Sequence, residues 1–116
     1  MWMNTQIVTP AATAYTYYTP WFPRGADNGV FALEMLESTV GNGWTATVVH
    51  KNREDEGSAP ATAGTFASLS GNFYEVNCTG LKELLRYQIQ VSSREINEGV
   101  VFRFLAPTWY STATVP

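Results

Sequence analysis

Large apolar residues alternate with small or polar residues along several short stretches of the chain, which is the pattern of a half-buried β-strand. Phe31, Leu33 and Met35 follow this pattern, so we expect a strand whose three side chains face a core. Residues 87–91 alternate in the same strict way. The preceding stretch, residues 80–86, has the propensity to begin a helix, but the alternation favours a strand.

Turn residues divide these stretches and predict how the strands pair. Residues 41–43, with the sequence Gly-Asn-Gly, suit a tight hairpin into a strand with many β-branched residues at 44–50. We expect the last strand, residues 100–105, to pair with the strand at 87–91 through the polar turn at 92–99. The stretch from Lys51 to Ala63 is charged and then rich in small residues, which predicts an exposed loop.

A second hairpin is expected around Ser70-Gly71-Asn72, which separates residues 65–67 from 73–78. In the latter stretch Tyr74, Val76 and Cys78 fall on one face of the predicted strand.

Near the N-terminus, residues 14–17 alternate Thr with aromatic residues, and Pro20 and Pro23 bracket the next two aromatics, which indicates an arm or an edge strand. Seven short strands at regular spacing favour an all-β antiparallel sandwich. We place the sandwich at residues 24–105, an N-terminal arm at 1–23 and a C-terminal arm at 106–116.

All charged side chains lie between Arg24 and Arg103, so the two ends are uncharged although they hold 9 of the 16 aromatic residues. Disordered tails have the reverse composition, and these ends therefore predict a surface that meets a partner. A net charge of −3 and a pI of about 5.0 argue against binding to nucleic acid or to an anionic membrane. The first residues lack a basic segment, so we expect no secretory signal.

The aromatic residues of the ends have three interpretations. They anchor the arms in grooves of neighbouring subunits, they pack on their own domain, or some of them (Tyr15, Tyr17, Trp21 and Trp109) form a platform that stacks on sugars. The absence of charge favours intermolecular anchoring over sugar binding. The predicted partner-binding residues are Trp2, Tyr15, Tyr17, Tyr18, Trp21, Phe22, Trp109 and Tyr110.

Candidate catalytic groups are few, and none forms a constellation. His50 is the only histidine and Cys78 the only cysteine, so one chain cannot build a zinc site, and Cys78 is expected to be a buried structural thiol. Glu34 and Glu37 are expected to be solvated strand residues, and the acidic run at 54–56 lacks the spacing of a calcium loop. We therefore expect no catalytic residues, no metal, no cofactor and no enzymatic activity.

Leu81, six residues before Tyr87 and followed by Ile89 and Val91, resembles the start of the penultimate strand in fibronectin type III and other immunoglobulin-like domains. The resemblance implies an immunoglobulin-like sandwich in which Leu81 plugs one end and the Tyr87 hydroxyl bonds to nearby backbone as a tyrosine corner. The sequence departs from the pattern at Glu83, where the family usually carries proline, and it lacks the cysteine pair of antibody domains.

In overall character, and in its exit segment at residues 104–110, the chain also looks like the small β-sandwich cement or decoration proteins of tailed bacteriophage capsids. This resemblance implies a virion protein, assembled in the host cytoplasm, that self-associates or binds the major capsid protein or other virion subunits through its arms by strand addition and aromatic insertion. A tail or baseplate component and a carbohydrate-binding β-sandwich module are the alternatives.

Overall fold

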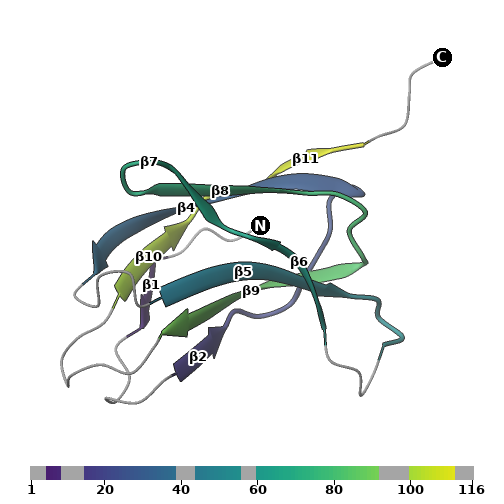
Figure 1. Ribbon diagram of the computed structural model, residues 1–116. Helices are drawn as coiled ribbons and strands as arrows, with labels where there is room; N and C mark the ends of the chain where they lie inside the picture. The colour runs from purple at the N-terminus through teal and green to yellow at the C-terminus, as the bar shows by residue number, and fades with distance from the viewer. Residues whose placement is uncertain (1–4, 9–14, 39–43, 56–59, 92–99, 112–116) are drawn as a thin grey trace.

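The computed structural model shows two antiparallel β-sheets packed face to face, with no helix among the residues that it describes (Figure 1). These are residues 5–8, 15–38, 44–55, 60–91 and 100–111. The predicted all-β sandwich is confirmed at this level.

One layer, which we call the β4 sheet, runs in the order β1-β10-β4-β8-β7, and β11 also pairs with β4. Its strands are β1 (Thr5–Val8), β4 (Asn28–Ser38), β7 (Ala67–Ser70), β8 (Phe73–Cys78), β10 (Val100–Phe104) and β11 (Thr108–Tyr110). The other layer, the β9 sheet, runs in the order β2-β9-β5-β6, and β3 also pairs with β9. Its strands are β2 (Tyr15–Tyr18), β3 (Phe22–Pro23), β5 (Trp44–Lys51), β6 (Ala61–Thr65) and β9 (Leu84–Val91).

The core lies between the layers and follows the alternation of the sequence. Phe31 and Leu33 are completely buried, as predicted, and Met35 is half-buried and packs against the same core. Across from them Tyr74 and Val76 pack on the core, and Cys78 is fully buried. The predicted faces of both strands are therefore confirmed.

The predicted hairpin around residues 70–72 is confirmed, but its first strand is β7 rather than residues 65–67, because Thr65 belongs to β6 of the other sheet. The two other predicted pairings are wrong. Strand β4 pairs with β10 and β8, whereas β5 pairs with β9 and β6. The connections after β4 and after β9 therefore cross from one sheet to the other. The loop predicted at residues 51–63 ends earlier in the structure, because β6 begins at Ala61.

The described parts of both chain ends are strands of the sandwich. β1 pairs with β10, β2 and β3 both pair with β9, and β11 pairs with β4. Phe22 of β3 is 6% exposed and lies in the core cluster. The two sheets thus extend beyond residues 24–105.

The residues that resemble the immunoglobulin pattern occupy the core, but the predicted hydroxyl bond is wrong. Leu81 and Tyr87 are buried. The Tyr87 hydroxyl is buried without a hydrogen-bond partner among the described residues. Instead the Tyr87 backbone N–H donates to the Thr19 hydroxyl oxygen at 2.9 Å, and Thr19 N–H donates to the Tyr87 carbonyl at 3.1 Å. The strand is fixed by these backbone contacts to the N-terminal segment.

Replacement of Phe22 by alanine should destabilise the protein by about 3–5 kcal/mol, because it leaves a cavity in the core. Deletion of residues 1–23 should unfold the sandwich, because it removes Phe22 together with strands β1, β2 and β3. Chemical denaturation measures both effects. Tyr18→Ala is the matched control, since Tyr18 is 47% exposed on the neighbouring strand and should lose about 1 kcal/mol or less. An equal loss in the two variants would contradict the core position of Phe22.

Candidate interaction surface

Strand β7 forms an edge of the β4 sheet, and its four residues are all exposed. It pairs with β8 on one side, and no other described strand pairs with it. No charged residue occurs from Gly64 to Tyr74. An edge strand without lysine, proline or an inward charge keeps its unpaired N–H and C=O groups open to another chain.

Three large apolar side chains gather at the same end of the β4 sheet. They are Leu36, Leu69 and Phe73, with exposed fractions of 45%, 65% and 44%, and we call them the apolar corner. A register shift between Ser68 and Ser70 marks Leu69 as the extra residue of a β-bulge. A bulge shortens the stretch that another strand can pair with, which favours a specific partner over open-ended association.

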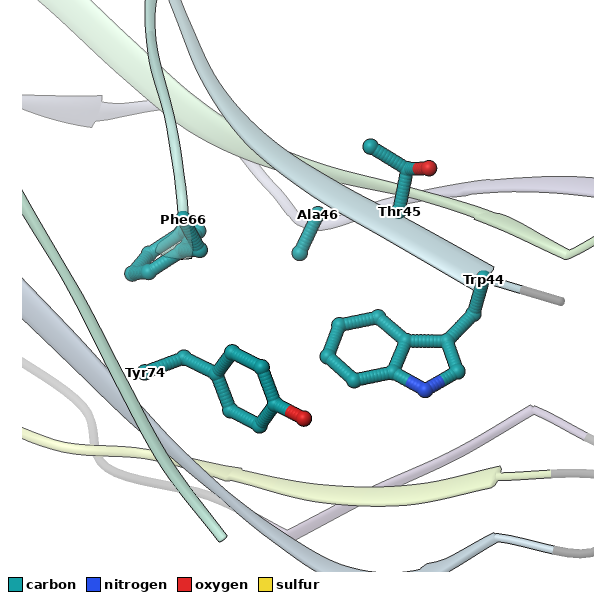
Figure 2. Close-up of a pocket in the computed structure, with 5 residues that line it drawn as sticks. All are labelled: Trp44, Thr45, Ala46, Phe66 and Tyr74. Carbon is teal, nitrogen blue, oxygen red and sulfur yellow. The ribbon is translucent and has the colours of Figure 1, made fainter. Parts of the chain in front are cut away.

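A pocket lies behind this corner, between the two sheets (Figure 2). It has a volume of about 230 Å³ and is lined by Trp44, Thr45, Ala46, Phe66 and Tyr74. Phe66 stands where the chain crosses from β6 in one sheet to β7 in the other, and its backbone N–H donates to the Ala46 carbonyl at 3.0 Å.

Three of the five lining residues are aromatic, and one of them, Trp44, also packs against the core residue Phe102. The Trp44 ring meets the rings of Tyr74 and Phe102 edge to face, with 4.9 Å between centroids in each case. Figure 2 shows the Tyr74 ring beside the Trp44 indole, with Phe66 at the other end. Pockets for drug-sized ligands usually measure about 300–1,000 Å³. This smaller pocket suits a single inserted side chain.

Several residues predicted to bind a partner pack instead on their own domain. Tyr17 and Trp109 pack against the core, and Phe22 belongs to it. The Trp109 ring meets Phe31 at 5.5 Å and 90° and covers Gly25, where a Cβ atom would lie 2.6 Å from the indole. This close approach explains why glycine suits position 25.

The other predicted partner-binding residues have different surroundings. Tyr18 and Trp21 lie against cations: the Arg86 guanidinium carbon is 4.0 Å and 4.4 Å from their ring centroids. The Tyr110 hydroxyl donates to the Asn77 amide oxygen at 2.5 Å. Tyr15 belongs to β2, and Trp2 lies outside the described residues.

One predicted alternative was an aromatic platform that stacks on sugars. Those of its residues whose side chains are described do not lie together on one surface. Trp109 belongs to the β4 sheet, whereas Tyr17 and Trp21 lie at β2 and β3 of the β9 sheet. Tyr17 and Trp109 turn toward the core, and Trp21 lies against cations.

The titratable groups with perturbed environments form no catalytic arrangement in the described part of the chain. His50 Nδ1 accepts a hydrogen bond from Lys82 N–H at 3.1 Å, and burial, with a smaller effect of the Lys82 charge, lowers the pKa of His50. Burial raises the pKa of the Cys78 thiol to about 11. Within the described ranges there is no cluster of three or more potential metal ligands. The described residues also include no helix long and apolar enough to cross a membrane.

Comparison of the chain with protein-family models, curated proteins and solved structures gives no match.

Sequence reasoning missed both the β7 edge and the pocket. Ala67-Ser68-Leu69-Ser70 is short and has weak strand propensity. The signal that could have found it is the uncharged run from Gly64 to Tyr74, because surface strands that stay unpaired usually carry charge.

The Cys78 thiol should resist iodoacetamide in the folded protein. At pH 8 a pKa of about 11 leaves roughly one molecule in a thousand as thiolate, about a hundredfold fewer than in the unfolded chain. Mass spectrometry should therefore show labelling at least about a hundredfold slower in buffer than in denaturant. The raised pKa also stabilises the fold below pH 9, and this contribution should fall as the pH rises from 9 toward 11. Equal labelling rates would contradict the burial.

Proposed function

We propose that the chain is a non-enzymatic structural protein of a virus particle, a cement or decoration protein of a tailed-phage capsid that holds neighbouring subunits together. The observation that carries the proposal is the β7 edge, which is exposed, uncharged and paired on one side only among the described strands. The overall resemblance of the chain to such proteins supplies the biological setting.

Binding proceeds by strand addition. An extended segment of a neighbouring subunit pairs with the free backbone groups of β7, as in other complexes formed by β-augmentation. The apolar corner gives this contact apolar area, because Leu69 lies on the edge strand, Phe73 on the adjacent strand β8 and Leu36 near the end of β4. The pocket behind it accepts one side chain of the added segment.

The neighbour is the major capsid protein or another copy of this chain. Each contact is small, but many identical contacts in a symmetric shell bind strongly through high effective concentration.

The setting is tested by mass spectrometry of particles purified from the system that encodes the chain. We expect the protein in intact particles at a fixed ratio to the major capsid protein, since cement proteins occupy lattice positions. Its absence from particles would overturn the proposal, and its presence in tails alone would assign it to the tail or baseplate instead.

The binding surface is tested with Leu69→Lys. A lysine in the bulge places a charge in the contact and should weaken association at least about tenfold, which corresponds to ~1.4 kcal/mol. Light scattering of the isolated chain and its copy number in particles measure the effect.

Gln90→Lys is the matched control, because it adds the same charge at an exposed position of the central strand β9. Both variants should keep the thermal stability of the parent protein, since neither side chain is buried. Normal association of the Leu69→Lys variant would rule out β7 as the contact.

A further inference from the structure

Four side chains form an alternating ladder of rings and cations, which we call the cation–aromatic ladder: Tyr18, Arg86, Trp21 and Lys51. The Arg86 guanidinium carbon lies 4.0 Å from the Tyr18 ring centroid and 4.4 Å from that of Trp21. Lys51 Nζ lies 4.7 Å from the Trp21 ring centroid. The ladder thus spans β2, β9, β5 and the segment before β3.

The ladder lies on the outer face of the β9 sheet. Leu85 and Tyr87 point into the core, so Arg86 between them points outward. Val49 is paired with Arg86 across β5 and β9 and therefore shares its face. Val49 is only 4% exposed yet lies outside the core cluster, as expected if the ladder covers it.

No acidic residue on the strands of the β9 sheet balances the positive charges of Arg86 and Lys51. The strands β2, β3, β5, β6 and β9 contain no Asp or Glu. The one ion pair among described residues joins Glu34 to Arg103, in the β4 sheet. In a protein with a net charge of −3, Arg86 and Lys51 thus both lie against the Trp21 ring, on a sheet whose strands carry no carboxylate.

The guanidinium of Arg86 is held in one orientation. Two rings this close to the same carbon atom must flank it on two sides, which restricts the rotation of a long side chain. Its Nε is buried and has no hydrogen-bond acceptor among the described residues. A ligand reaches the guanidinium through its remaining N–H groups, which lie in its plane and suit the two oxygens of a carboxylate.

We propose that the cation–aromatic ladder is a binding site for a carboxylate group of a ligand, with Arg86 as the planar donor and Lys51 as the second cation. The half-buried Gln88 follows Arg86 on the same face of β9 and is paired with Tyr18 of the ladder, so it supplies an amide next to the site. The carboxylate belongs either to an acidic sugar or to an acidic side chain of a protein. The site is independent of the β7 edge and of the proposed function.

The ladder also holds β2 and β3 to their sheet, and the test must separate binding from this structural role. The isotope-labelled full chain is titrated at constant ionic strength with glucuronate and with N-acetylglutamate α-methylamide, each of which carries one carboxylate, and glucose serves as the uncharged probe. Proton–nitrogen NMR follows the Arg86 Nε–H and the Trp21 indole N–H. Both acids should shift these signals saturably below about 100 mM, whereas glucose should not.

Arg86→Lys keeps the charge but loses the planar donor, so it should weaken binding of both acids at least about tenfold. Arg103→Lys makes the same change on the other sheet and should bind as the parent does. If Arg86→Lys does not fold, Lys51→Gln is the second variant, with an expected loss of about threefold.

Shifts that stay linear to about 100 mM, or equal binding by Arg86→Lys, would overturn the proposal. Tighter binding of glucuronate than of the glutamate methylamide would identify an acidic sugar as the source, and the reverse order would identify a protein side chain. Equal affinity would show that the site recognises the carboxylate group alone.

Discussion

The two sheets meet at the ring of Tyr87, and the rest of the fold depends on that contact. The ring is fully buried, stacks on Phe104 at 4.2 Å, and lies within about 6 Å of three further rings. These are Phe22 of β3, Phe31 of β4 and Phe66 at the crossover between the sheets. One side chain therefore joins β9 to the N-terminal segment and to strands β4 and β10 of the opposite sheet. A buried hydroxyl without a partner costs about 1–3 kcal/mol, which the packing of so many aromatic rings outweighs.

The period-two patterns predicted which residues face the core, because alternation on a strand is a local property. Phe31, Leu33 and Cys78 lie where their alternation places them. Strand pairing was not predictable in the same way. A turn sequence such as Gly-Asn-Gly at 41–43 permits the chain to reverse, but whether the next strand joins the same sheet or the opposite one depends on partners far away in the sequence. Here β5 pairs with β9, which begins more than thirty residues later.

The candidate site was less accessible to sequence reasoning than the fold. The sequence indicated that aromatic residues at the ends are unusual, but it could not separate Phe22, which fills the core, from Tyr18, which stays exposed. The ladder depends on Arg86 meeting rings more than sixty residues earlier, and no local pattern encodes such a contact. The open edge at β7 arises from topology, because β7 is the last strand in the order of its sheet. Its own sequence does not show that its outer side is left without a partner strand.

The pairing of β1 with β10 gives the chain an order of events during synthesis. Thr5 lies opposite Arg103, so β1 can pair only after a strand about a hundred residues further along the chain has been made. Until then β1 has no native partner in the β4 sheet and can meet chaperones or other nascent chains. A sheet that joins strands so distant in the sequence therefore closes late in folding, and its unpaired strands are open to aggregation before it closes.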